Sequence, residues 1–140
     1  MTTKEFLKAV KNGQKEFEKL VFDSANFEFQ TFEGIKFLNC TFLRCNFGHA
    51  QITDCDFSRN YLAYSDFNRT FLKGSKFDYA VMYRANLYNA KCAGASFKET
   101  LLSRRYIDKA IDLDTSNIAN NFYRNTREKP PYAFPSDEEV

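Results

Sequence analysis

The sequence contains no apolar run near the roughly 20 residues that span a bilayer, which excludes a membrane-spanning helix. Its first residues lack the apolar segment of a secretory signal, so we expect a cytoplasmic protein with four unpaired cysteine thiols. An excess of one charge is also missing, since 20 Lys and Arg face 18 Asp and Glu. No strong field therefore favours nucleic acid or an anionic membrane as a partner. Tryptophan is absent and glycine occurs 5 times, whereas phenylalanine occurs 16 times and 44% of residues are apolar, enough for a core.

Recognisable catalytic and metal-binding motifs are missing as well. There is no Walker A loop, no glycine-rich dinucleotide loop and no His-Glu-x-x-His. The single histidine, His49, has no positioned nucleophile with which to form a triad. The cysteines Cys40, Cys45, Cys55 and Cys92 lack the Cys-x-x-Cys spacing of zinc sites. We therefore expect a non-enzymatic protein with no catalytic residues, metal, cofactor or small-molecule substrate.

What the sequence does contain is a five-residue period. Every fifth residue from Phe17 to Ile107 is apolar, and most of the early ones are Phe. The residue two positions earlier is Ala, Ser, Thr or Cys in thirteen of the sixteen units between Ala25 and Thr100. Asn or Asp often stands just before the large residue. A helix repeats near 3.6 residues and a strand at two, so this period predicts a coil that turns a corner every five residues and stacks on its neighbours.

The repeated unit resembles the motif of the pentapeptide-repeat family, Ala-Asp/Asn-Leu/Phe-X-X. Seventeen consecutive units run through residues 20–104, about 60% of the chain, without an insertion. The resemblance implies an all-β solenoid, a right-handed quadrilateral β-helix of about four coils. The end sequences add short helical caps at the N- and C-terminal ends. The units closest to the motif are Ala25-Asn26-Phe27, Cys45-Asn46-Phe47, Cys55-Asp56-Phe57, Ser65-Asp66-Phe67 and Ala85-Asn86-Leu87.

Residues 1–19 are predicted to form an N-terminal capping helix and a lead-in to the first coil. Thr2 and Glu5 have the spacing of a capping box. Gly13 is the expected end of this helix. Such a cap would cover the unpaired backbone groups that the end of a coil stack exposes.

Residues 105–129 are predicted to form a C-terminal helical cap or a dimerisation segment. The five-residue period is kept at Ile107 and is lost after it. Because related proteins often dimerise through a C-terminal segment, the resemblance places candidate dimer contacts at Ile118 and Phe122. Residues 130–140 are predicted to form a flexible acidic tail.

With four units per coil, residues twenty apart stack, and one outer face becomes aromatic, apolar and rich in arginine. Tyr64 is then predicted to lie between Arg44 and Arg84 in a cation–π arrangement. This composition is typical of a protein interface. Two alternatives stay open: the terminal segments cover this face, or these residue types simply favour sheet surfaces. The candidate partner-binding residues are Leu43, Arg44, Tyr61, Tyr64, Val81, Tyr83, Arg84 and Leu101.

The sequence thus predicts a rigid protein–protein interaction module whose partner is another protein or a second copy, giving a homodimer. An alternative is a DNA mimic, because some members of the family are acidic rods that inhibit or protect DNA-binding enzymes such as topoisomerases; a nuclease is an analogous target. Such mimicry needs a dense acidic stripe, yet residues 20–104 hold 8 acidic and 10 basic residues. Direct binding of nucleic acid is not expected either, because the basic residues are dispersed.

Overall fold

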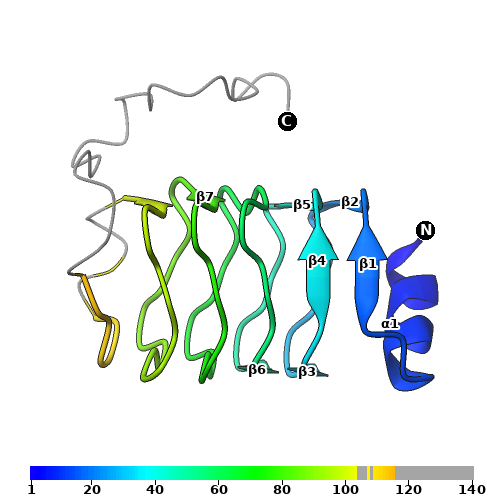
Figure 1. Ribbon diagram of the computed structural model, residues 1–140, viewed down its shortest axis with the longest axis horizontal. Coiled ribbons are helices and arrows are strands. Elements are labelled where there is room, and N and C mark those ends of the chain that lie inside the picture. The colour runs from blue at the N-terminus through cyan, green and yellow to red at the C-terminus, as the bar shows by residue number, and fades with distance from the viewer. Residues whose placement is uncertain (104–106, 108, 116–140) are drawn as a thin grey trace.

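The chain winds into a stack of similar coils along one long axis (Figure 1). This computed structural model describes residues 1–103, 107 and 109–115. The elements within them are α1 (Thr3–Lys11), β1 (Glu16–Glu18), β2 (Val21–Asp23), β3 (Thr31–Glu33), β4 (Lys36–Leu38), β5 (Thr41–Leu43), β6 (Gln51–Thr53), β7 (Val81–Met82) and β8 (Leu101–Leu102).

The strands pair in parallel, and each strand residue lies opposite the residue twenty positions later in the chain. β1 pairs with β4, β2 with β5, β3 with β6 and β7 with β8, each as a small two-stranded sheet. In the second of these pairs Phe22 lies opposite Phe42. Single parallel bridges keep the same spacing between the strands, for example from Tyr61 to Val81. The twenty-residue spacing predicted from four units per coil is therefore confirmed.

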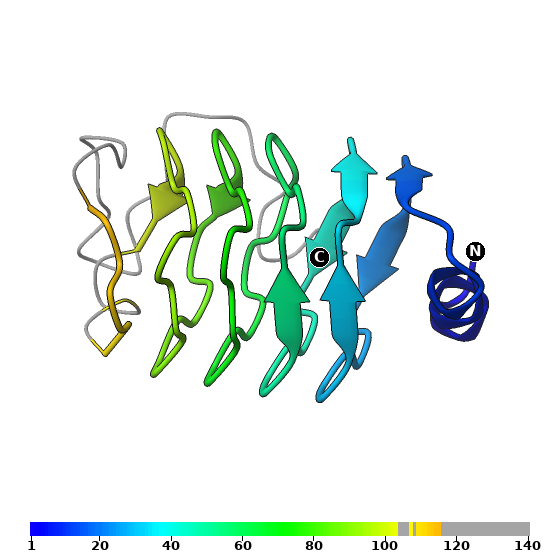
Figure 2. The ribbon, with the colours of Figure 1, turned by 60° about the horizontal axis from the view of Figure 1, so that its bottom comes forward.

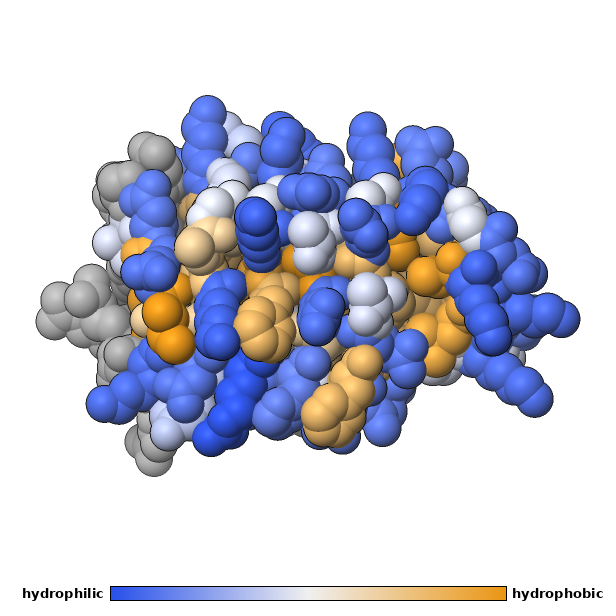
Figure 3. Space-filling model, turned by 90° about the horizontal axis from the view of Figure 1, so that it is seen from below, coloured by the Kyte–Doolittle hydropathy of each residue, from blue (hydrophilic) through white to orange (hydrophobic). Residues whose placement is uncertain are grey.

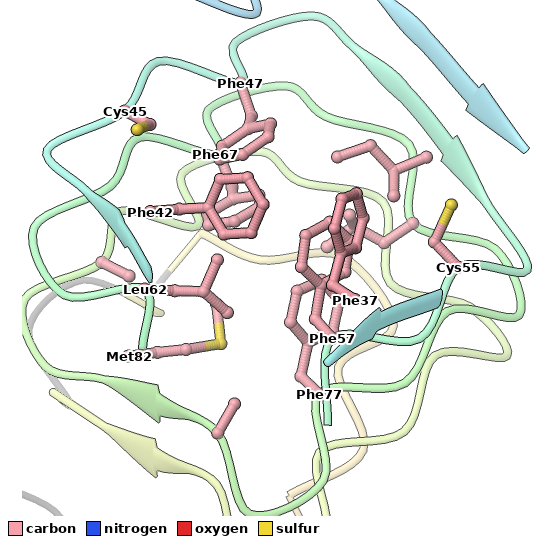
Figure 4. Close-up of a cluster of buried hydrophobic side chains, with 14 of the residues drawn as sticks. Phe37, Phe42, Cys45, Phe47, Cys55, Phe57, Leu62, Phe67, Phe77 and Met82 are labelled. Atoms are coloured by element: carbon pink, nitrogen blue, oxygen red, sulfur yellow. The ribbon is translucent and has the colours of Figure 1, made fainter. Parts of the chain in front are cut away.

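The large residue of each unit points into the coil and stacks on its counterpart in the next coil (Figure 4). The ring centres of Phe57 and Phe77 lie 5.2 Å apart, and the two ring planes are inclined by 1°. Phe47 and Phe67 lie 4.8 Å apart at 7°. Rings within one coil meet edge to face instead, as Phe37 and Phe42 do at 86°. Both geometries suit the ring quadrupole, and the prediction that residues twenty apart stack is confirmed for these inner rings.

Each unit ends in a residue with left-handed backbone, two positions after the large residue. This conformation recurs every five residues from Lys19 (φ 57°) to Glu99 (φ 51°), and only three of these corners are glycine. Left-handed backbone costs an L residue about 1–2 kcal/mol. Hydrogen bonds between coils hold the corners, as when the Arg59 amide donates to the Asp78 carbonyl at 2.9 Å. The five-residue period is thus the spacing between corners.

The small polar residue of the unit joins one coil to the preceding one. The Ser75 hydroxyl is buried, donates to the Ile52 carbonyl at 2.8 Å and accepts from the Cys55 amide at 3.1 Å. Asn60, an exception to the small-residue pattern, makes the same bridge, since its side chain accepts from the Cys40 amide and donates to the Phe37 carbonyl. The position therefore requires either a small apolar group or a side chain that satisfies buried backbone groups.

The Asn or Asp before each large residue closes its own turn. The Asp66 carboxylate accepts from the Asn68 amide at 2.8 Å, and the Asn46 side chain accepts from the Gly48 amide at 2.8 Å. These are side-chain turns of the kind that Asx residues favour. The recurrence of Asn and Asp in the unit follows from this local hydrogen bond.

At the N-terminal end, α1 lies across the first coil (Figure 2). The capping box is confirmed, because the Thr2 hydroxyl accepts from the Glu5 amide while the Glu5 carboxylate accepts from the Thr2 amide. The helix ends at Lys11, and Gly13 follows with φ 93°. The fully buried ring of Phe6 contacts five rings of the first coil and its lead-in: Phe17, Phe22, Phe27, Phe32 and Phe37.

At the other end, the pairing continues past the predicted boundary at residue 104. Ile111 bridges Lys91, and its amide donates to the Ala90 carbonyl at 2.8 Å. The twenty-residue spacing of the backbone thus reaches Ile111, although the five-residue pattern of large apolar side chains is lost after Ile107. Backbone pairing does not require the side-chain motif. The predicted dimer contacts Ile118 and Phe122 and the acidic tail lie outside the described residues.

Candidate interaction face

The predicted partner-binding residues lie on one side of the stack, the side of β2, β5, β7 and β8. Tyr61 bridges both Thr41 of β5 and Val81 of β7, and Val81 lies opposite Leu101 of β8. The parallel ladder therefore carries the predicted outer column, and Figure 1 shows β2, β5 and β7 along one edge of the view. We call the eight predicted residues, Leu43, Arg44, Tyr61, Tyr64, Val81, Tyr83, Arg84 and Leu101, the Tyr/Arg face.

This face is less open than the sequence suggests. Leu43, Tyr83 and Leu101 are only 6%, 7% and 1% exposed, whereas Val21 at the start of the same side is 72% exposed. Leu43, Ala63 and Tyr83 form a buried cluster separate from the core, with Tyr61 and Tyr64 packed against it. Ala63 is too small to hold its two larger neighbours in the column apart. The expectation that all eight residues are surface contacts thus needs correction for these three, which are buried; Leu43 and Tyr83 pack against Tyr61 and Tyr64.

Half of the predicted cation–π arrangement is present. The guanidinium carbon of Arg84 lies 5.5 Å from the centre of the Tyr64 ring and 5.5 Å from that of Tyr83. Those two rings meet edge to face, with centres 5.8 Å apart. Arg84 therefore makes cation–π contacts with both tyrosine rings.

Arg44 makes an ion pair instead of covering Tyr64. Its Nε and Nη2 atoms donate to the two carboxylate oxygens of Asp23 at 3.0 and 2.6 Å. The Arg44 and Ser24 hydrogen bonds lower the pKa of Asp23, and the Asp23 carboxylate raises the pKa of Arg44. Both groups are exposed, so the pair fixes the direction of the arginine more than it stabilises the fold.

The four cysteines are buried and unpaired with one another. Burial raises the pKa of Cys45 and of Cys55 to about 11, and that of Cys92 to about 12. The Cys45 thiol donates to backbone carbonyls, including that of Leu43 at 3.5 Å. A thiol held protonated is a poor nucleophile and metal ligand. Among the described residues, no group of three or more His, Cys, Asp or Glu is placed to hold a metal ion.

Other aromatic and basic side chains pair along other sides of the stack. Arg59 lies 4.6 Å from the centre of the Tyr79 ring, and the Lys91 ammonium lies 4.4 Å from that of Phe71. Exposed His49 stacks on Phe29 at 4.9 Å. Sequence reasoning missed these pairs, although each joins residues twenty apart and the register alone could have found them.

Comparison with known families identifies the repeat. The sequence profile described as "Pentapeptide repeats" matches residues 21–59 and 65–104, in 8 copies. The chain belongs to the pentapeptide-repeat family. No curated protein sequence matches this pentapeptide-repeat protein. In the described part of the chain, no helix has both the length and the apolar character needed to cross a bilayer.

Two solved structures share the fold. A pentapeptide-repeat protein of the Arabidopsis thaliana thylakoid lumen matches with a TM-score of 0.50 and 17% identity, covering 75% of this chain and 81% of the other. The protein Rfr23 of the cyanobacterium Cyanothece 51142 matches with a TM-score of 0.50 and 14% identity, covering 84% of this chain and 99% of the other. The repeats therefore form a right-handed β-helix solenoid.

Proposed function

We propose that this pentapeptide-repeat protein is a non-enzymatic, rigid protein–protein interaction module that binds its partner through the Tyr/Arg face. The observation that carries the proposal is the second apolar cluster, which lies outside the solenoid core and supports Tyr61 and Tyr64. A solenoid is stabilised by contacts between stacked repeats, and here the inner columns and the bonds between coils already supply them. Tyrosines held on an additional outer cluster match the composition of interface hot spots.

The face is preorganised, which reduces the entropy cost of binding. Tyr61 is held by a backbone bond from its amide to the Cys40 carbonyl at 3.1 Å, and the Tyr64 amide donates to the Tyr83 carbonyl at 2.9 Å. Tyr61, Tyr64 and Val81 are half-buried, and Arg44 is exposed at the rim. Partner contact is thus assigned to these residues and to Arg84, whose guanidinium lies over the Tyr64 ring. The buried Leu43 and Tyr83 support Tyr61 and Tyr64 from below.

The test is affinity capture from the native source by wild type, by the double variant Tyr61→Ala/Tyr64→Ala, and by a matched control. The control, Tyr79→Ala/Tyr88→Ala, removes two tyrosines that are each 43% exposed on other sides. We expect mass spectrometry to find a partner that the control retains and the face variant loses. Equal capture by both variants, with thermal unfolding like that of wild type, would contradict the proposal.

Charge gives less support to the alternative, a mimic of DNA. On the side of β4 the outer column alternates in sign, since Lys36 bridges Asp56 and Asp56 bridges Lys76. Alternating charges do not reproduce the uniform negative charge of a phosphate backbone. If a captured partner nevertheless binds DNA, competition by duplex DNA that weakens with salt would favour mimicry.

The homodimer proposal has its own test, because Ile118 and Phe122 lie outside the described residues. We propose that self-association depends on these two side chains. Sedimentation velocity of Ile118→Asp/Phe122→Asp should then show a monomer where wild type sediments as a dimer. A variant that still dimerises would move the contact elsewhere.

A further inference from the structure

A second surface, on the side of β3 and β6, carries an apolar groove of about 320 Å³. Figure 3 views this side and shows apolar side chains gathered between hydrophilic ones. The groove is lined by Phe71, Leu72, Lys73, Lys91, Ala93 and Gly94. It is separate from the Tyr/Arg face and shares no residue with it, so a ligand bound here is independent of the function proposed there.

The groove lies where the residues of this wall are small in the last coil. The inner column on this side shrinks from Phe32 through Ile52 and Leu72 to Cys92, and the stretch from Cys92 to Ala95 holds no side chain larger than cysteine. The corner glycine Gly94 adds no side chain to the hollow. A Cβ added to Gly94 would meet only the Gly74 amide nitrogen, at 3.6 Å, within 4 Å of it.

An aromatic ring forms one wall. Phe71 is 40% exposed, although the chain buries most of its phenylalanines, and Ile111 on the following coil is 42% exposed. The Lys91 ammonium lies 4.4 Å from the centre of the Phe71 ring. An exposed aromatic beside a hollow with an apolar floor is suited to receive one apolar side chain.

The charged groups of the lining are both positive. Lys73 and Lys91 are exposed and border the apolar floor. The neighbouring carboxylates do not line the groove: Asp54 lies over Gly74, and Asp112 follows Ile111 on the next coil. The lining itself therefore favours a ligand that places negative charge on either side of an apolar group.

We propose that this groove binds an acidic peptide segment of a protein partner, with one apolar side chain seated against Phe71, Ala93 and Gly94. Carboxylates of the segment pair with Lys73 and Lys91. The Phe71 ring and the apolar floor supply the contact area, and the two lysines select acidic over basic segments.

The probe is the synthetic peptide acetyl-Asp-Glu-Leu-Glu-Asp-amide, titrated into the ¹⁵N-labelled full chain. We expect amide shifts that cluster at Phe71, Lys73, Lys91, Ala93 and Gly94. The basic counterpart acetyl-Lys-Lys-Leu-Lys-Lys-amide should not bind. Absence of shifts at millimolar peptide, shifts centred on another side, or equal binding of the basic peptide would overturn the proposal.

Two variants separate charge from shape. Lys73→Glu/Lys91→Glu should weaken peptide binding about tenfold or more, because it reverses two exposed charge pairs. The control Lys36→Glu/Lys76→Glu makes the same charge change on the side of β4 and should leave peptide binding unchanged. Ala93→Leu fills the groove without changing charge and should also weaken binding. The proposal is overturned if the control weakens binding as much as the groove variant, or if filling the groove has no effect. Wild-type-like amide spectra establish that each variant is folded.

Discussion

The first and last coils of the solenoid share one backbone register but differ in what fills them. In the first coil every large residue of the five-residue period is phenylalanine, and these four rings pack beneath Phe6 of α1. The last coil is filled by Met82, Leu87, Cys92 and Phe97. The backbone bonds between coils tolerate this loss of side-chain volume, because parallel bridges with the same twenty-residue spacing continue along the stack. The volume of the inner side chains thus changes along the stack while the backbone register stays the same.

The largest effect should come from emptying an aromatic column. Phe57→Ala removes a fully buried ring stacked on both Phe37 and Phe77. We expect a loss of about 3–5 kcal/mol in the free energy of unfolding, measured by urea denaturation. Cys92→Ala, in the thinner column, should cost about 1 kcal/mol or less, since it removes one small group. Equal losses at the two positions would mean that the coils do not differ in packing.

The next largest loss of stability should come from removing the Ser75 hydroxyl, which bridges two coils. Ser75→Ala leaves the buried Ile52 carbonyl and Cys55 amide without their side-chain partner. The expected loss is about 1–3 kcal/mol, read from the same denaturation curves. Ala85→Ser, at an equivalent position in the last coil where alanine already stands, is the control and should change stability little. A harmless Ser75→Ala would show that the bridge is dispensable.

The buried thiols predict a loss of stability in alkali. Their ordinary pKa is 9.0, and burial raises the pKa of Cys45 and of Cys55 to about 11. Between pH 9 and pH 11 these thiols ionise in the unfolded chain but stay protonated in the folded protein. The stability that the buried thiols contribute is therefore fully present below pH 9 and is lost as the pH rises toward 11. The double variant Cys45→Ala/Cys55→Ala should lose less stability than wild type between these two pH values in thermal melts. An identical slope would exclude the thiols as its cause.

The smallest effect concerns the corners. Lys19 is exposed and adopts φ 57°, so Lys19→Gly should stabilise the protein by up to about 1 kcal/mol as the left-handed strain is relieved, less the greater chain entropy of glycine. Gly94→Ala, at a corner that is already glycine, should destabilise the protein. Thermal unfolding of both variants measures the difference, and changes of the same sign would show that corner strain is not what distinguishes them.

Much of the candidate site could be predicted from the sequence, though not its exposure. The five-residue period placed Tyr61 beside Val81 and Phe57 over Phe77, as the structure has them. It did not reveal that Tyr83 packs over Ala63, or that Arg44 turns to Asp23. Those outcomes depend on side-chain sizes and rotamers in adjacent coils, which a period along one chain does not encode.

The sequence by itself determined the solenoid, its inner columns and the residues that stack, because a repeated local turn fixes the backbone path and hence which side chains point inward. Only the tertiary structure decided which outer residues stay open and where the wall is hollow. The groove needs Phe71 and Lys73 from one coil and Lys91, Ala93 and Gly94 from the next. Its shape is therefore a property of neighbouring coils in contact, set by the volume that each leaves unfilled.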